Sequence, residues 1–227
     1  MTIPNHLAII PDGNRRWARK NKLPVFYGHQ KGFQALKKII RKGFKMGIKI
    51  ITIWGFSTEN WQRSKQEVSH LMRLFKKIVD NYLKEALKKQ IRLVHLGRKD
   101  RLDKILIEKI TQAENQTKKF DKNFLCCALD YGGQDEIIRA INKLISTNIK
   151  SITKETFNQF LDTRDLPYPY PDLIIRTSGE QRLSGFLTWQ SGYAELIFVK
   201  KYLPDFTEKD LENCLIEYSK RKRRFGQ

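Results

Sequence analysis

The stretch Leu7-Ala8-Ile9-Ile10-Pro11-Asp12-Gly13-Asn14-Arg15-Arg16-Trp17-Ala18 decides the fold prediction. Its apolar start is typical of a buried parallel strand, and residues 14–21 read as a short helix after a sharp turn. Ligands of open α/β sheets bind where strands end, which is where Asp12 stands. One carboxylate, one amide and two guanidinium groups at such a turn suit a metal-bound phosphate. Residues 11–14 also fit an ordinary β-turn, and that alternative stays open at this point.

Strand and helix patterns alternate along the rest of the chain. Strands are predicted at residues 48–54, 91–96, 124–129, 172–175 and 195–198, and helices at residues 28–46, 67–89, 101–118, 134–146 and 208–223. The alternation predicts an α/β fold with a mostly parallel central sheet of about six strands, flanked by helices. No Pro-, Gly- or Ser-rich linker divides the sequence, so we expect a single domain over residues 1–227.

The charge balance indicates an anionic partner. The sequence has 44 Lys and Arg against 24 Asp and Glu, a formal net charge of +20. Nucleic acid, a diphosphate substrate and an anionic membrane surface all fit such an excess. Pairs such as Lys37-Lys38 lie on helices with an apolar opposite face, which is typical of a solvated surface. A basic nucleic-acid-binding protein stays the main rival hypothesis.

The expected location is the cytoplasm. The longest apolar run, residues 48–56, contains Lys49 and is too short to span a membrane. No secretory signal pattern is visible at the N-terminus. Cys126, Cys127 and Cys214 lack the spacing of a disulfide framework or a paired-cysteine zinc site.

Two further polar clusters follow predicted strands. Residues 56–63, Phe-Ser-Thr-Glu-Asn-Trp-Gln-Arg, are either helix-capping residues or a lid with two aromatic rings over an apolar ligand. The apolar face of the helix at residues 67–89 is either ordinary core or the wall of a tunnel for a hydrocarbon chain. Residues 176–184 carry Arg176, Arg182 and Ser184, which suit the binding of a diphosphate. Glu195 stands among apolar residues and should have a cationic partner.

In this order the motifs resemble the cis-prenyltransferase family. The resembling segments are residues 6–18, Gly28-His29 with Gly32, residues 56–61 with Arg63 and Glu67, Tyr131-Gly132-Gly133, and residues 175–190 with Glu195. The resemblance implies condensation of isopentenyl diphosphate units onto an allylic diphosphate, usually farnesyl diphosphate, with Mg²⁺, by a homodimer. It implies a long-chain product, undecaprenyl diphosphate for the cell-wall lipid carrier. Nucleic acid is then not expected as a partner, because it would leave Asp12, Glu59 and Glu195 without a role.

The resemblance also implies a role for individual residues. Asp12 would handle the Mg²⁺-bound diphosphate, Asn14 would share the catalytic centre, and Glu195 would aid the metal or the second substrate. Residues that would hold the allylic diphosphate are Gly13, Asn14, Arg16 and His29, with Trp17 and Arg63 as further substrate contacts. Residues that would hold isopentenyl diphosphate are Arg176, Arg182 and Ser184. A lid would comprise Phe56, Ser57, Glu59, Asn60, Trp61 and Glu67.

Some positions depart from the family pattern or leave a question open. Val25 stands where an Arg is common, and Asp130 where Asn is more usual. The ending Arg224-Phe225-Gly226 resembles an Arg-X-Gly ending that reaches toward the partner subunit's site. The proton acceptor stays open among Asn14, His29 and the released diphosphate. The absence of an Asp-Asp dipeptide excludes the trans-prenyltransferases, whose paired Asp-rich motifs are missing here.

Overall fold

One sheet of six parallel strands organises the molecule. The computed structural model describes residues 1–147, 149 and 151–221. The strands are β1 (His6–Ile10), β2 (Ile50–Ser57), β3 (Ile91–Leu96), β4 (Asn123–Tyr131), β5 (Leu173–Arg176) and β6 (Glu195–Phe198). Their order is β3-β4-β2-β1-β5-β6, and every neighbouring pair is parallel. The predicted α/β fold with about six parallel strands is confirmed.

The helices follow the predicted alternation with shifted boundaries. They are α1 (Asn14–Lys20), α2 (Val25–Lys45), α3 (Lys65–Lys89), α4 (Lys104–Thr117), α5 (Gly133–Ile145), α6 (Lys154–Asn158) and α7 (Glu208–Lys220), with the 3-10 helices η1 (Thr58–Gln62) and η2 (Leu203–Asp205). Helix α2 begins at Val25 because Pro24 stands at its N-cap. Strand β2 runs on to Ser57 because Phe56 and Ser57 still pair with β4 across an irregularity at Gly55. Helix α6 and η2 were not predicted.

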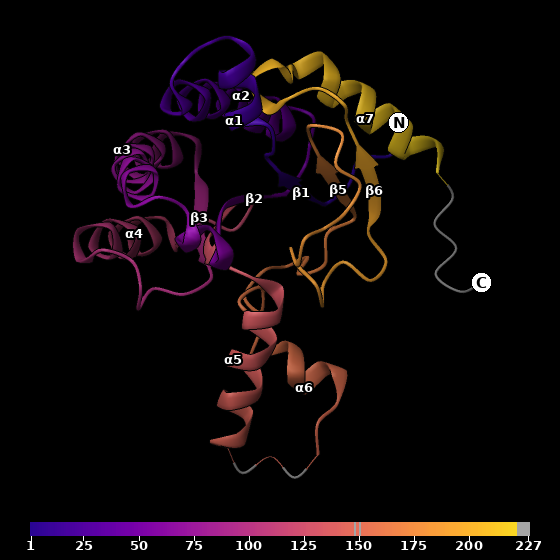
Figure 1. Cartoon of the computed structure of the whole chain (residues 1–227). Coiled ribbons are helices and arrows are strands. Elements are labelled where there is room, and N and C mark those ends of the chain that lie inside the picture. Colours follow the sequence, from indigo (N-terminus) through magenta and orange to yellow (C-terminus); the bar gives the residue numbers. More distant parts are fainter. Residues whose placement is uncertain (148, 150, 222–227) are drawn as a thin grey trace.

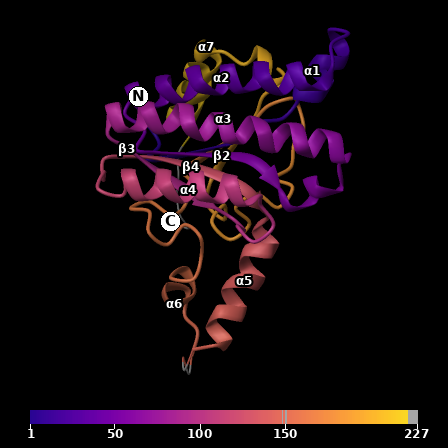
Figure 2. The ribbon, with the colours of Figure 1, turned by 90° about the vertical axis from the view of Figure 1, so that its left-hand side faces the viewer.

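The two faces of the sheet are covered differently. Buried residues of α2, α3 and α7, such as Ile39, Ala86 and Leu215, pack on one face, and α4 packs against α3 beside them (Figure 2). The other face is covered by loop residues, including Leu166, Phe186 and Leu187. Helices α5 and α6 extend away from the sheet (Figure 1). In the part of the chain that the structure describes, no helix is long and apolar enough to cross a bilayer.

The strand order creates a crevice at the carboxyl ends of β1 and β5. Strand β1 lies between β2 and β5, and the chain leaves β1 toward β2 but leaves β5 toward β6. Loops that diverge in this way open a ligand-binding crevice in α/β sheets. Ile10 pairs with Arg176 in register. The segments that follow Ile10 and Arg176, 166 residues apart in sequence, therefore lie side by side.

Candidate active site

The first polar cluster is the turn after β1. Gly13 adopts a left-handed backbone conformation with φ 101°, and its nitrogen donates to Asp12 Oδ1 at 2.6 Å. The Thr177 hydroxyl bonds both the nitrogen and the carbonyl oxygen of Asp12, at 2.9 and 2.7 Å. Asp12 is thus held in place by its own turn and by the residue after β5.

Two arginines converge on the Asp12 carboxylate. Arg176 Nη2 donates to Asp12 Oδ2 at 2.9 Å, and Arg16 Nη2 lies 3.1 Å from Asp12 Oδ1. Burial opposes ionisation of Asp12, but the hydrogen bonds and charges of Arg176 and Arg16 outweigh it and hold the pKa of Asp12 below its usual value. Asp12 is therefore a carboxylate at neutral pH.

Arg176 is the most fixed cation of the cluster. Its side chain is 7% exposed, and its Nη1 donates to the carbonyl oxygen of Arg182 and to Ser184 Oγ. The guanidinium of Arg182 is instead 61% exposed and pairs with Glu180 at 2.6 Å. Glu180 also accepts from Arg16 at 2.6 Å. Arg176 thus contacts Asp12 directly, whereas Arg182 is linked to it through Glu180 and Arg16.

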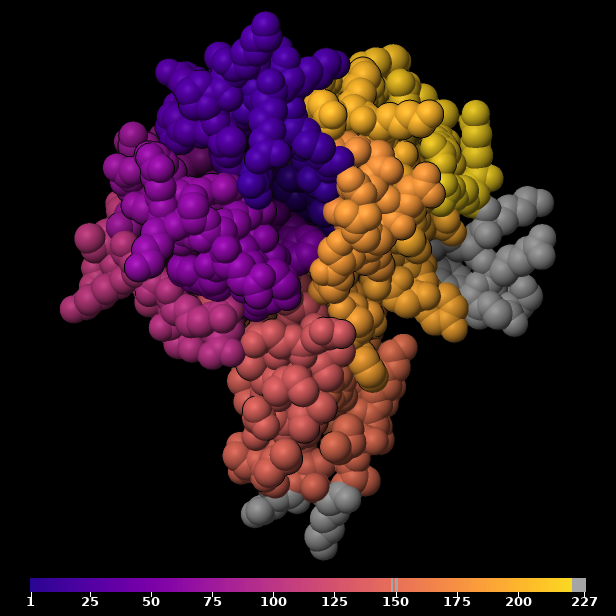
Figure 3. All heavy atoms as spheres, in the orientation of Figure 1, coloured from indigo at the N-terminus to yellow at the C-terminus, as the bar shows by residue number. Residues whose placement is uncertain are grey.

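An apolar cavity of about 390 Å³ begins at this charged rim. Asp12, Asn14, His29, Arg176 and Ser184 line its polar end. The apolar lining comes from α2, α3 and the sheet, and includes Phe33, Leu36, Ile40, Ile53, Leu71, Leu74, Phe75, Ile78, Val79, Tyr82 and Leu125. The middle of α3 is therefore the wall of a cavity, while Met72 and Ala86 of the same helix are core. Figure 3 shows a recess where the indigo N-terminal segment and the orange segment after β5 meet.

A second, polar pocket of about 340 Å³ adjoins the first. Its lining includes Asp12, Gly13 and Asn14 of the turn after β1, and His29 of α2. Four arginines complete it: Arg15, Arg16, Arg19 and Arg63. Arg19 was not among the predicted site residues, and Arg15 was counted only as one of the two guanidinium groups at the turn. Their four-residue spacing on one helix, which places both on the same face, is the signal that identifies them.

Buried polar atoms without a hydrogen bond gather at this rim, although two of them, Arg15 Nε and His29 Nε2, face Glu67 Oε1 at 3.8 and 3.6 Å. Among those in the described part of the chain are Asn14 Oδ1, Arg15 Nε, His29 Nε2 and Arg176 Nε. A buried polar atom that lacks a hydrogen bond is costly and calls for a ligand, an ion or water. Burial, together with the charge of Arg63, lowers the pKa of His29 to about 4, so its imidazole is neutral at pH 7. The rim is thus prepared to bind a polar, anionic group.

Glycines of α2 serve packing between helices. A Cβ at Gly28 would lie 2.1 Å from the backbone oxygen of Asn14, and one at Gly32 would lie 2.2 Å from Asn14 Oδ1. Their close neighbour is therefore α1. These glycines let α2 press on the turn after β1 and fix Asn14.

Only part of the predicted lid lines the cavity. Phe56, Ser57 and Asn60 of the predicted lid line it, as does Arg63, the predicted substrate contact. Ser57 forms a capping box with Asn60 at η1. Trp61 packs edge-on against Phe56 and donates its Nε1 to Asp130 at 2.8 Å. Neither Trp61 nor Glu59 is among the lining residues.

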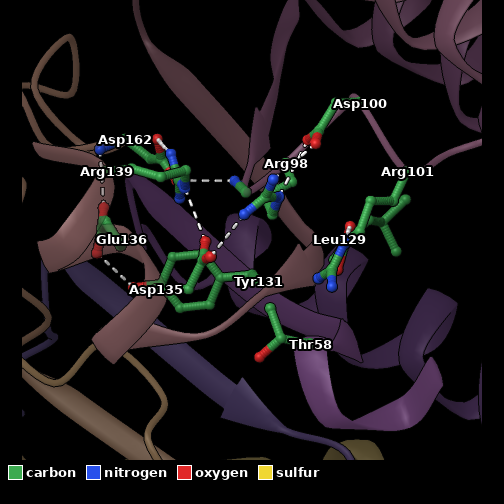
Figure 4. A network of polar contacts seen from close by, with 12 residues as sticks. Thr58, Arg98, Asp100, Arg101, Leu129, Tyr131, Asp135, Glu136, Arg139 and Asp162 are labelled. Atoms are coloured by element: carbon green, nitrogen blue, oxygen red, sulfur yellow. Dashed lines mark hydrogen bonds and ion pairs between the residues drawn. The ribbon is translucent and has the colours of Figure 1, made fainter. Parts of the chain in front are cut away.

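A polar network behind β4 supports η1. Asp130, fully buried with φ 51°, accepts from both Trp61 and Arg101. Figure 4 shows the neighbouring part of the network around Tyr131, with the pairs Arg98–Asp135 at 3.0 Å and Arg139–Asp162 at 2.6 Å. A Cβ at Gly132 would lie 2.5 Å from Thr58 Oγ1. Gly132 thus packs closely against η1, whereas a Cβ at Gly133 would meet Thr188 and Gly185 of the segment after β5.

Several predicted residues lie elsewhere. Glu195 begins β6 opposite Leu173, at the amino end of the strands, whereas Asp12 follows the carboxyl end of β1. Within the described chain Glu195 is therefore not brought to Asp12, although its predicted cationic partner exists: Arg221 Nη1, at 2.8 Å. Trp17 donates to Asp205 and ties α1 to η2. The ending Arg224-Phe225-Gly226 falls outside the described residues.

The whole chain resembles known prenyltransferases. Residues 10–226 match the prenyltransferase family model described as undecaprenyl diphosphate synthase. The chain belongs to this family. An isoprenyl transferase of Thermotoga maritima is 47% identical, with 100% of this chain and 98% of that protein covered. The ditrans,polycis-undecaprenyl-diphosphate synthase ((2E,6E)-farnesyl-diphosphate specific) of Micrococcus luteus is 42% identical, with 99% and 92% covered.

A solved structure of a family relative shares the fold. The lavandulyl diphosphate synthase of Lavandula x intermedia, in complex with dimethylallyl diphosphate, superposes with a TM-score of 0.95 at 39% identity, covering 99% of this chain and 98% of that one. Family membership and the shared fold make this chain an isoprenyl transferase.

The donor set at Asp12 fits a magnesium ion that is shared with a substrate. No group of three or more His, Cys, Asp and Glu side chains that could form a metal cage exists among the residues described by the structure. Mg²⁺ is usually bound by one or two carboxylates together with substrate phosphates. Asp12 offers one hard, ionised carboxylate beside the guanidinium groups that suit a diphosphate.

Proposed function

We propose that this isoprenyl transferase adds isopentenyl diphosphate units to farnesyl diphosphate and makes undecaprenyl diphosphate. The observation that carries the proposal is the Asp12–Arg176 pair at the mouth of an apolar cavity. A charged rim suits two diphosphates, and an apolar cavity suits a growing hydrocarbon chain. The printed name of the Micrococcus luteus relative supports this primer and this product.

The polar pocket is proposed as the allylic diphosphate site. Gly13 lies in its wall, and Asn14, Arg16 and His29 turn polar groups toward it. Arg15, Arg19 and Arg63 add positive charge, which compensates for Val25 at the position where the family commonly has Arg. Bound at Asp12, Mg²⁺ would neutralise diphosphate charge as a Lewis acid.

Arg176 and Ser184, with Arg182, are proposed to hold isopentenyl diphosphate. Arg176 is buried and oriented by three acceptors before any substrate binds. Such preorganised donors hold the isopentenyl diphosphate in place for the reaction. The charge that develops when the allylic carbon–oxygen bond breaks falls on the diphosphate in the polar pocket, where Arg16 would stabilise it. The allylic diphosphate leaves with the electron pair of that bond, and the double bond of isopentenyl diphosphate attacks the cationic allylic carbon. One proton then passes from the new chain to a base, for which the released diphosphate, Asn14 and His29 are the candidates. Phe56 and Asn60 border the reacting end of the cavity and would exclude water.

A homodimer is proposed because helix α5 exposes apolar side chains. Ile138, Ile141 and Ile145 of α5 are 58%, 38% and 76% exposed. They recur at three- and four-residue spacing, so they form one apolar stripe. Exposed apolar stripes of this kind mark association surfaces. A second copy of the chain would cover this stripe.

A cytoplasmic location is also proposed, because it fits the basic, cysteine-poor composition.

Chromatography of reaction products tests the proposal. Farnesyl diphosphate and labelled isopentenyl diphosphate, with and without Mg²⁺, should give a long polyprenyl diphosphate only with the metal. Asp12→Ala should abolish incorporation without loss of folded structure, because Arg176 and Ser184 remain. Asp165→Ala removes a carboxylate that is 70% exposed and serves as the control. Near-normal incorporation by Asp12→Ala, or a short product from the wild type, would contradict the proposal.

A further inference from the structure

We infer that the corner formed by the connection between α1 and α2 docks on a membrane surface that contains anionic lipids. This docking corner comprises Arg19, Lys20, Lys22, Leu23, Phe26, Tyr27 and Lys31. It protrudes at the end of the helical layer (Figure 2). The inference goes beyond the proposed reaction and concerns where the enzyme is held.

The charge of the corner is uncompensated. Between Asp12 and Glu59 the sequence has twelve Lys and Arg and no Asp or Glu. Later in α2, Arg41 and Lys42 find partners on other helices, Glu85 at 2.6 Å and Glu212 at 2.5 Å. The four cations of the corner are exposed and form no ion pair within the described part of the chain. An anionic surface would supply the missing counter-charge.

The corner also exposes apolar side chains. Leu23, Phe26 and Tyr27 are 41%, 37% and 51% exposed, within one turn of chain at the start of α2. The Phe26 ring contacts the rings of Tyr27 and His70, at centroid distances of 5.9 and 5.7 Å, so it bridges α2 and α3. Aromatic and aliphatic side chains flanked by Lys and Arg are the composition of an interfacial membrane contact.

The corner adjoins the entrance to the active site. Arg19 lines the polar pocket together with Arg16 and His29, and His29 follows Phe26 by one turn of α2. The apolar cavity continues from this end between α2 and α3. Docking would therefore set the charged rim beside the headgroups. A nucleic acid would satisfy the cations but offers no hydrocarbon phase for Leu23, so the observations favour a bilayer.

Vesicle co-sedimentation of the full chain, without substrates, tests the inference. Wild type should pellet with vesicles of phosphatidylcholine mixed with phosphatidylglycerol but not with phosphatidylcholine alone. Lys20→Gln, Lys22→Gln and Lys31→Gln together should weaken binding about a hundredfold, since each lysine near such a surface contributes about fivefold. Lys38→Gln, Lys45→Gln and Lys49→Gln remove the same charge elsewhere and should leave most of the binding intact.

A second pair of variants tests the apolar contribution. Leu23→Ser, Phe26→Ser and Tyr27→Ser together should weaken vesicle binding about tenfold or more, whereas serines at the exposed Leu87, Ile105 and Ile216 should not. Circular dichroism confirms that each variant is folded. Absence of wild-type binding, or equal losses in corner and control variants, would overturn the inference. So would tighter binding of an RNA oligonucleotide that the serine variants leave unchanged. Since no substrate is present, failure here leaves the proposed reaction untouched.

Discussion

Substitution of Gly28 by Ala is expected to destabilise the protein although helix propensity predicts the opposite. Gly28 lies inside α2, where Ala is intrinsically better than Gly by about 1 kcal/mol. The new Cβ, however, would lie 2.1 Å from the backbone oxygen of Asn14 and 3.1 Å from Ala18 Cβ. Backbone cannot rotate away, so α1 must move from α2 by roughly 1 Å to restore an ordinary contact.

The structure sets the size of the effect. Overpacking against rigid atoms costs about 3 kcal/mol, which leaves a net loss of about 2 kcal/mol after the propensity gain. For a chain of this length, such a loss lowers the melting temperature by about 4–8 °C. The shift of α1 would also move Arg16 away from Asp12 and Glu180, so prenyl transfer should fall with stability.

Two other glycines of α2 provide matched controls. At Gly43 the added Cβ would meet Ile51 Cδ1 at 2.8 Å. That atom is the end of a flexible side chain, so the net change should be close to zero. At Gly32 the neighbour is Asn14 Oδ1 at 2.2 Å, so activity should fall more than stability. Circular dichroism during thermal unfolding gives the melting temperatures of the three variants, and incorporation of labelled isopentenyl diphosphate gives their activities. A Gly28→Ala protein as stable as Gly43→Ala would refute the reasoning.

Two further predictions concern pH and the support of η1. Burial lowers the pKa of His6, His29 and His95 to about 4, so the unfolded chain is protonated first as pH falls below about 6.5. Protonation of each of these three histidines in the unfolded chain should lower the free energy of unfolding by about 2 kcal/mol by about pH 5. Equal urea midpoints at about pH 7.5 and about pH 5 would contradict this prediction. Asp130→Ala should cost about 2 kcal/mol because Trp61 and the part-exposed Arg101 lose their acceptor, while Asp130→Asn should cost about half as much. Melting temperatures compare the two variants, and equal shifts would argue against this role of Asp130.

The strands and the polar turns could be predicted from sequence because both are local. The apolar run of residues 7–10 and the break at Pro11 are visible without any tertiary information. The meeting of Asp12 with Arg176 is not local. It depends on β5 pairing with β1, and hydrophobic periodicity does not specify strand order.

Glu195 shows the limit of motif reasoning. A carboxylate among apolar residues suggests a functional group, and its need for a cation was predicted and is met by Arg221. Glu195 is the first residue of β6 and pairs with Leu173, the first residue of β5, so it lies at the amino end of the parallel strands. The predicted strand at residues 195–198 in a parallel sheet already implies this end, whereas the resemblance to a family motif carries no information about the edge of the sheet.

The ion pairs of the rim suggest how its cations differ in function. Asp12 is shared by Arg16 and Arg176, and Glu180 by Arg16 and Arg182. Exposed pairs contribute little free energy and exchange readily, whereas a buried, multiply bonded guanidinium is fixed. Arg182 is 61% exposed and Arg176 only 7%. We therefore expect an incoming diphosphate to find Arg176 already oriented, and to draw Arg16 and Arg182 from Glu180.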